Sequence, residues 1–213
     1  MKASIINQPW GRVISVLLSG LLVASAGIWV QNAQAHSSAH VGSEVVQINK
    51  VAALEATLPS PAKAVKKIEV LDQEATAWAD ETYGVRLSEG LYSYFLAQDE
   101  QSNEIIGGAM VQRSRFQRGR LSLAVGVDAN QHITNVVLVS TNKNYLAELK
   151  TNVGEEVISF YRGMSVKEIA NAKALRFASK TAREFAVAVR NAAVLLATLM
   201  NSEQQVTTNA EGS

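Results

Sequence analysis

The sequence contains no cysteine, and this absence excludes several kinds of functional site. Without thiolates the chain forms no disulfides, iron-sulfur clusters, thiolate zinc sites or haem attachments of the Cys-x-x-Cys-His type. Histidine is nearly as scarce, because only His36, His40 and His132 occur in 213 residues. A histidine metal site and a Ser-His-Asp triad are therefore not predicted, and no nucleophile is paired with a base. We interpret His132 as a turn residue at the start of a strand.

The chain also lacks an excess of charge of either sign. It carries 20 basic and 19 acidic residues. Lys2 and Arg12 are the charged residues of positions 1–35, so residues 36–213 retain 18 basic and 19 acidic residues, a net charge of −1. Proteins that bind nucleic acid usually present a clear excess of basic residues. No nucleic-acid partner is therefore predicted.

The first 35 residues have the pattern of an export signal. Lys2 and Arg12 precede residues 13–30, an uncharged run of 18 residues, and the small-x-small sequence Ala33-Gln34-Ala35 follows. A basic start, an apolar run and such a site are typical of a signal peptide. The run also reaches the lower limit for a membrane span, and a tryptophan stands near each of its ends. The sequence therefore predicts a periplasmic protein, released by cleavage or anchored to the inner membrane by residues 13–30 as a transmembrane helix.

The rest of the chain divides into a tether, one domain and a tail. Residues 36–50 are rich in Ser, Gly, His and Val and lack helical periodicity, which is typical of a tether. Residues 51–200 form the predicted domain. Residues 201–213 are polar and are predicted to be a flexible tail.

Alternating apolar positions predict an antiparallel sheet in the middle of the domain. Residues 91–97 and 104–112 form one predicted hairpin, and residues 120–127 and 132–139 form a second. Apolar residues in the second hairpin alternate with Ser, Ala and Gly, which predicts one covered face. The predicted loop at 113–120 contains four arginines. It fits a solvated loop or a site for a phosphate or an acidic partner.

Helices are predicted before and after these strands. Residues 51–58 form a helix that ends before a proline, and residues 64–71 form another. Residues 152–162 and 183–200 form helices after the sheet. The last helix carries an apolar stripe expected to lie across the sheet, made of Phe185, Val189, Ala192, Ala193, Leu196 and Leu199. Together these patterns predict an α+β fold, a twisted antiparallel sheet with helices packed on one side.

Two helix starts carry hydroxyl residues. Ser165 and Glu168 have the spacing of a capping box. Ser179 and Thr181 stand before the last helix, and Thr181 with Glu184 has the same spacing. A hydroxyl beside unpaired helix N–H groups suits an anion such as phosphate, and it equally suits an ordinary N-cap. Both interpretations of Ser179 and Thr181 stay open at this point.

Five short segments form an ordered set along the chain. They are Leu58-Pro59-Ser60-Pro61-Ala62, Ile105-Ile106-Gly107-Gly108-Ala109, Val125-Gly126-Val127-Asp128, Phe160-Tyr161-Arg162-Gly163-Met164-Ser165 and Ala188-Val189-Arg190-Asn191-Ala192. Together with the leader, their order and spacing resemble the FMN-binding domain family, over residues 51–200. That domain occurs in membrane-anchored, flavin-carrying subunits of the sodium-pumping NADH:quinone oxidoreductase and of the Rnf electron-transport complex. The resemblance implies a flavoprotein that binds FMN and takes part in electron transport.

The resemblance also implies which residues hold the cofactor. Ala178 and Thr181 match the family's pattern of Ser-Gly-Ala-Thr, a spacer and Thr-Ser, and Ser179 stands for the threonine that bonds the FMN phosphate. Residues 143–148 align with the loop that lies beside the flavin ring. The cofactor-binding residues implied in this way are Ser179, Thr181, Ala178, Lys180, Arg176 and Asn144.

Two positions depart from the family's pattern. Lys173 stands where the family has an acid, and Phe177 stands where a glycine lets phosphate approach the backbone. These departures disfavour covalent attachment of FMN. Two hypotheses follow from the sequence. In the first, the chain is an FMN-binding electron carrier for a membrane redox partner, and the flavin does the redox chemistry. In the second, it is a flavin-free binding or assembly module that keeps the same fold.

Overall fold

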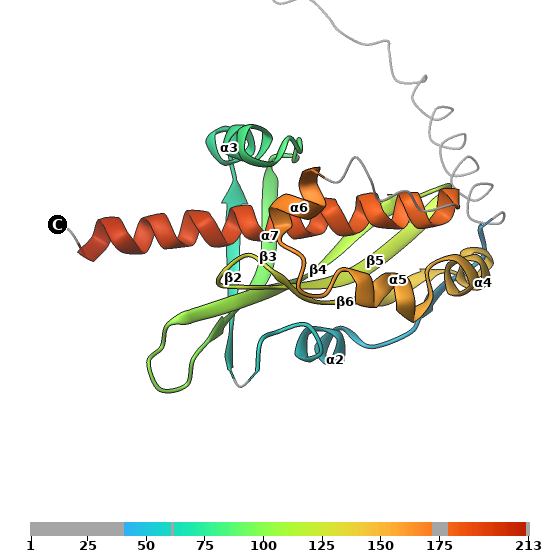
Figure 1. Ribbon diagram of the computed structural model, residues 1–213, viewed down its shortest axis with the longest axis horizontal. Coiled ribbons are helices and arrows are strands. Elements are labelled where there is room, and N and C mark those ends of the chain that lie inside the picture. The colour runs from blue at the N-terminus through green and yellow to red at the C-terminus, as the bar shows by residue number, and fades with distance from the viewer. Residues whose placement is uncertain (1–40, 61, 172–178, 212–213) are drawn as a thin grey trace, which may run out of the picture. The chain divides into compact units, whose positions relative to one another are not determined.

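Six antiparallel strands form one twisted sheet at the centre of the fold (Figure 1). The computed structural model describes residues 41–60, 62–171 and 179–211, so the predicted export signal lies outside the described residues. The strand order across the sheet is β1-β6-β5-β4-β3-β2, so β2 to β6 each pair with their neighbours in the sequence. The strands are β1 (Glu44–Val46), β2 (Lys63–Leu71), β3 (Gly90–Gln98), β4 (Ile105–Phe116), β5 (Gly119–Asp128) and β6 (Ile133–Asn142).

Both predicted hairpins are confirmed, but the predicted loop at residues 113–120 is wrong. β4 and β5 continue through this segment and join in a two-residue turn, since Phe116 pairs with Gly119. Gln117 takes a left-handed φ of 51° in that turn. The alternation of side chains also continues to the tip, because Ser114 is half-buried and Phe116 is buried between exposed arginines. The arginines therefore project from strands and not from a loose loop.

The segment predicted as a second helix, residues 64–71, is instead the edge strand β2. It pairs with β3 along its whole length. Half-buried residues such as Val65 alternate with exposed ones such as Ile68 and Val70, which is the period of a strand. The spacing of apolar residues alone also fits a helix, but the β-branched side chains favour the pleated form once β3 lies beside them.

The helix α7 (Lys180–Glu211) crosses one face of the sheet and supplies much of the core (Figure 1). The predicted stripe is confirmed, because Phe185, Val189, Leu196 and their partners in it are buried. Gly108 of β4 lies under this helix, and a Cβ atom there would come within 3.0 Å of the Met200 sulfur. The missing side chain lets α7 lie directly on the strand. The helix continues to Glu211, beyond the predicted end at residue 200.

A short helix, α2 (Lys50–Glu55), covers part of the opposite face of the sheet. Its Ala53 packs against Ala124 and Val139, as a separate small core. Gly126 of β5 is required here, because a Cβ atom would lie 1.9 Å from the Thr57 carbonyl oxygen. The helix predicted at 51–58 is thus confirmed, although it begins one residue earlier and ends at Glu55.

The remaining helices lie on the side of α7. They are α3 (Gln73–Tyr83), α4 (Lys143–Asn152), α5 (Gly154–Phe160) and α6 (Val166–Asn171). The capping box before α6 is confirmed, since the Ser165 N–H donates to Glu168 Oε2 at 2.8 Å and the Glu168 N–H donates to Ser165 Oγ at 3.2 Å. The helix predicted at 152–162 corresponds to the shorter α5, which begins at Gly154, where φ is a left-handed 51°, and ends at Phe160, while Asn152 is the last residue of α4. The α+β class, an antiparallel sheet with helices, is confirmed.

One helix among the described residues is long and apolar enough to span a membrane. It is the Lys180–Ser202 part of α7. Of its most apolar window, 72% is buried within the protein, which is the behaviour of a core helix. This helix therefore needs no membrane to explain its composition.

Candidate functional site

The residues that the resemblance assigns to FMN fall on two helices. Ser179 immediately precedes α7, Lys180 and Thr181 lie in its first turn, and Asn144 lies in α4. Ala178 and Arg176 lie outside the described residues, as do Lys173 and Phe177.

Ser179 is the N-cap of α7. Its Oγ accepts a hydrogen bond from the Ala182 N–H at 3.1 Å, and its carbonyl oxygen accepts one from the Arg183 N–H at 3.2 Å. This is the ordinary capping arrangement, which satisfies a backbone donor that the helix leaves unpaired. The capping interpretation of this serine is therefore confirmed.

Thr181 does not form the predicted capping box with Glu184. The Thr181 side chain is buried, with 1% of the residue exposed, and its hydroxyl donates to Glu148 Oε1 of α4. Glu184 pairs instead with Lys180, at 3.6 Å between Oε1 and Nζ. The box fails because Thr181 already lies inside the helix, where its hydroxyl reaches a neighbouring helix and not the N–H groups of its own first turn.

The Thr181 bond brings together the two segments that the resemblance places around a flavin. Residues 143–148 are the first turns of α4 and not a loop. Glu148 of this helix contacts Thr181, whereas Asn144, one turn earlier, lies near Gly42, where a Cβ atom would be 3.1 Å from Asn144 Oδ1. The meeting point of α4 and α7 is therefore Glu148 and Thr181, and sequence reasoning did not identify Glu148.

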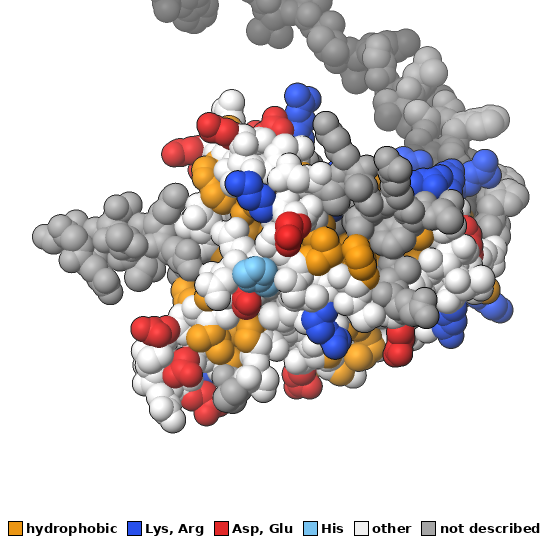
Figure 2. Space-filling view, in the orientation of Figure 1, with side chains coloured by type: hydrophobic (Ala, Val, Ile, Leu, Met, Phe, Trp, Pro, Cys, Tyr) orange, Lys and Arg blue, Asp and Glu red, His pale blue; other side chains and the backbone are white. Residues whose placement is uncertain are grey.

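The start of α7 and the tip of the β4–β5 hairpin border one groove of about 400 Å³. Arg115 and Gln117 line it from the hairpin, and Lys180, Arg183, Glu184 and Val187 line it from α7. Its lining thus has three cations and one acid, a net charge of +2. Figure 2 shows Lys and Arg side chains gathered at the end of the molecule where α7 begins. We call this the basic groove.

Contacts with α4 hold the hairpin tip in place beside the groove. The Tyr145 hydroxyl accepts a hydrogen bond from the Arg118 N–H at 3.3 Å, and its ring meets the ring of Phe116 edge-on at 5.8 Å. Gln117 Nε2 lies 3.5 Å from Glu148 Oε2. Because the tip is anchored on both sides of its turn, Arg115 projects from a fixed strand, and its Nε donates to the Gln117 carbonyl oxygen at 3.4 Å.

The acids at the groove have distinct surroundings. Glu148 receives the Thr181 hydroxyl and faces Gln117, so its charge lies at the end of α7 where helix N–H groups favour an anion. Glu184 Oε2 is buried and has no hydrogen-bond partner among the described residues. Any anion entering the basic groove would approach Arg115, Lys180 and Arg183 but would be repelled by these two carboxylates.

The charged side chains of the groove are suited to binding an anion. Within the described ranges, no group of three or more His, Asp and Glu side chains is placed to hold a metal ion. Tyr161, a potential proton donor, is buried against Phe185 at 6.4 Å between ring centroids, and burial raises the pKa of its phenol. What the geometry does present is a cationic surface beside a helix start, which suits a phosphate or carboxylate.

Comparisons with known proteins add no identification. No protein-family model matches the chain, and neither a curated protein nor a solved structure matches it significantly. The resemblance to the FMN-binding domain family therefore stays a prediction.

Proposed function

We propose that this chain is a binding module whose basic groove holds the phosphate of FMN reversibly, and that it serves membrane-associated electron transfer in the periplasm. The observation that carries the proposal is the convergence of Arg115, Lys180 and Arg183, from two distant parts of the sequence, on one groove of about 400 Å³. Ligand pockets range from roughly 300 to 1,000 Å³, so this groove has the size of a small one.

The described residues are better suited to non-covalent contacts with the phosphate than to a covalent bond with it. Three cations offer charge-assisted hydrogen bonds to phosphate oxygens. A phosphoester, by contrast, would use a hydroxyl that is already engaged, since Ser179 caps α7 and Thr181 is buried against Glu148. This supports reversible binding.

Bound FMN would supply the electron-transfer chemistry, and the chain's own residues would position it. Arg115 and Arg183 would face the phosphate from the hairpin and the helix, and Val187, which is 46% exposed, would offer an apolar surface one turn further along α7. Lys180, held by Glu184, would add charge without closing the groove.

The second candidate is a flavin-free binding or assembly module of the same fold. The Thr181–Glu148 bond favours it, because it places a carboxylate beside a residue that the resemblance assigns to the phosphate. Under this hypothesis the basic groove would receive an acidic segment of a membrane partner.

A flavin titration separates the two candidates. FMN fluorescence should be quenched by the full chain, and Arg115→Gln should weaken binding by about ten- to a hundredfold, because a charge-assisted hydrogen bond contributes roughly 1.5 to 3 kcal/mol. Arg86→Gln is the matched control, because Arg86 is exposed, forms an ion pair with Asp80 at 3.4 Å and does not line the basic groove. Absence of quenching in the wild type, or equal binding by both variants, would reject FMN binding in this groove.

The proposed location has its own test. Deletion of residues 13–30 should leave the product in the cytoplasm, because the export signal depends on that apolar run. A reporter fused after Ser213 that still reaches the periplasm in the deleted chain would contradict the location.

A further inference from the structure

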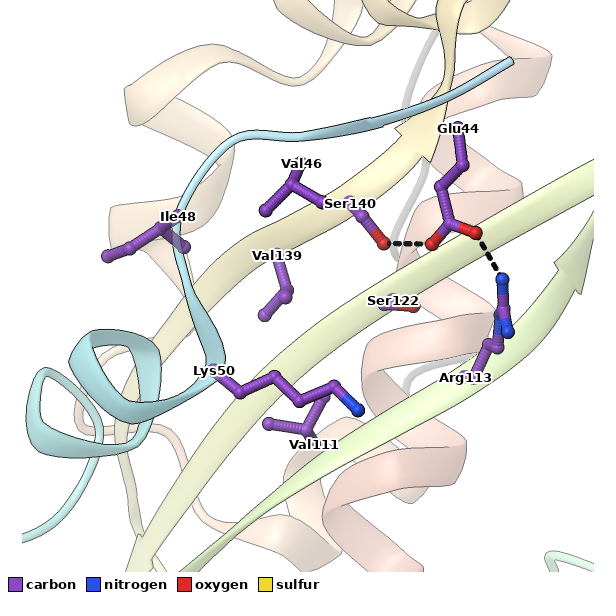
Figure 3. Close-up of a pocket in the computed structure, with 9 residues that line it drawn as sticks. All are labelled: Glu44, Val46, Ile48, Lys50, Val111, Arg113, Ser122, Val139 and Ser140. Carbon is purple, nitrogen blue, oxygen red and sulfur yellow. Dashed lines mark hydrogen bonds and ion pairs between the residues drawn. The ribbon is translucent and has the colours of Figure 1, made fainter. Parts of the chain in front are cut away.

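A second pocket lies on the face of the sheet opposite α7, beside the start of α2 (Figure 3). Its volume is about 440 Å³. It shares no lining residue with the basic groove. Strands β1, β6, β5 and β4 form its floor, and the segment between β1 and α2 forms one wall.

A β-bulge in β6 creates the pocket. Ser122 of β5 pairs with Ser140 and Leu123 pairs with Leu138, so Val139 is an extra residue in β6. The Val139 carbonyl oxygen accepts hydrogen bonds from the Gln47 and Ile48 N–H groups, at 2.8 and 3.4 Å. These bonds end β1 and lead the chain away from the sheet towards α2, so a hollow remains between that segment and the strands.

A row of paired residues crosses the pocket floor. Val46, Ser140, Ser122 and Arg113 are register partners on four successive strands. Glu44 ties the row together, because it accepts a hydrogen bond from Ser140 Oγ at 2.6 Å and forms an ion pair with Arg113. Both partners of Glu44 are therefore fixed, and its own charge is offset by the guanidinium.

Two polar groups in the pocket are left without such partners. The Ser122 residue is 6% exposed, and no hydrogen bond from the described part of the chain engages its hydroxyl. Lys50 extends over the floor and forms no ion pair with the described residues. With Glu44 and Arg113 offsetting each other, Lys50 gives the pocket a net charge of +1.

Charged, polar and apolar groups all line the pocket. Figure 3 shows the Lys50 ammonium with Val111 beside it, Ser122 and Arg113 towards β4, and Val46, Ile48 and Val139 towards β1 and the segment before α2. A ligand that satisfies both kinds of group needs one negative end with hydrogen-bond acceptors and one apolar end. A dianion would exceed the single uncompensated charge, and a cation would be repelled by Lys50.

We propose that this pocket is a binding site for a small monocarboxylate with an apolar body. The carboxylate lies between the Lys50 ammonium and the Ser122 hydroxyl, next to the guanidinium of Arg113. The apolar body lies against Val46, Ile48 and Val139, where it removes exposed apolar surface from water. Val46 is 64% exposed in the free chain, so a ligand covers a side chain that the fold leaves open.

Hexanoate is the probe that tests the site, with hexan-1-ol and hexylamine as neutral and cationic analogues of the same length. Backbone amide shifts of the full chain are followed by NMR as each compound is added. Hexanoate should shift the amides of Ile48, Ser122 and Ser140 in a saturable way, and the alcohol should bind about tenfold more weakly because it lacks the charge-assisted contact. Equal binding of acid and alcohol, or no saturable shift with hexanoate, would overturn the proposal.

Two pairs of variants locate the site. Lys50→Met keeps the apolar stem and should weaken hexanoate binding about tenfold, whereas Lys66→Met, on exposed β2, should not. Val46→Trp should fill the pocket and abolish binding, whereas Val51→Trp should not, since Val51 is 65% exposed and lies outside the lining. All four changes are at exposed positions, so the fold is retained. Loss of binding in a control, or its persistence in Val46→Trp, would refute the location.

Discussion

Replacement of Phe185 by alanine tests how the core depends on α7. The Phe185 side chain is fully buried, packs near Tyr161, and borders an apolar cavity of about 200 Å³ formed with Leu138, Leu149 and Ile158. Burial of a phenyl ring contributes about 1.5 to 3 kcal/mol, and each 50 Å³ of unfilled space adds roughly 1.2 kcal/mol. Because a cavity already lies beside the ring, neighbours have little chance to close the new space. We expect a loss near the upper part of the usual range of about 3 to 5 kcal/mol.

The measurement is equilibrium unfolding in urea. With a dependence of about 2 kcal/mol per molar urea, a loss of about 4 kcal/mol lowers the unfolding midpoint by about 2 M. Val187→Ala is the matched control, because Val187 lies two residues along the same helix and is 46% exposed. Its effect should stay within about 0.5 kcal/mol. Equal midpoints for Phe185→Ala and Val187→Ala would refute the packing of α7 on the sheet.

Three further changes probe separate parts of the fold. Tyr161→Phe removes a buried hydroxyl that has no hydrogen-bond partner among the described residues, so thermal unfolding should show equal or higher stability, by up to about 1 kcal/mol; a clear loss of stability would contradict this. Glu168→Gln tests the capping box. Hydrogen bonds from Ser165 lower the pKa of Glu168, so the charged carboxylate stabilises the fold above its ordinary pKa. The difference in unfolding free energy between wild type and variant should therefore shrink as the pH falls through the lowered pKa. A difference that is constant from pH 7 to pH 3 would contradict this. Gly126→Ala forces a Cβ atom against the Thr57 carbonyl oxygen and should cost roughly 1 to 3 kcal/mol, with NMR shifts centred on α2; a silent variant would show that α2 does not lie on β5.

Local sequence patterns predicted the structure correctly where the interacting residues are close in sequence. The capping box at Ser165 and Glu168, the β5–β6 hairpin and the apolar stripe of α7 all depend on residues within a few positions of each other. The segment at 64–71 shows the limit of such patterns. Its apolar spacing fits either a helix or a strand, and pairing with β3 decides between them.

The candidate site was only partly predictable, for the same reason. Sequence reasoning identified the hydroxyl residues before α7 and the arginines of 113–120, but treated them as separate features. The fold places Arg115 and Lys180 on one groove, although 65 positions separate them in the sequence. Glu148 was missed because no local signal links it to Thr181, and the bond exists only after α4 packs beside α7.

The place of α7 in the order of elements has a consequence for how the fold forms. This helix follows in the sequence every strand that it covers, so the apolar face of the sheet stays incompletely covered until α7 docks. Contacts between residues as distant as Tyr94 and Leu199 also form slowly, because a long loop must close first. Docking of α7 is therefore expected to be a late step of folding, and before it the partly covered face of the sheet exposes apolar surface that favours aggregation.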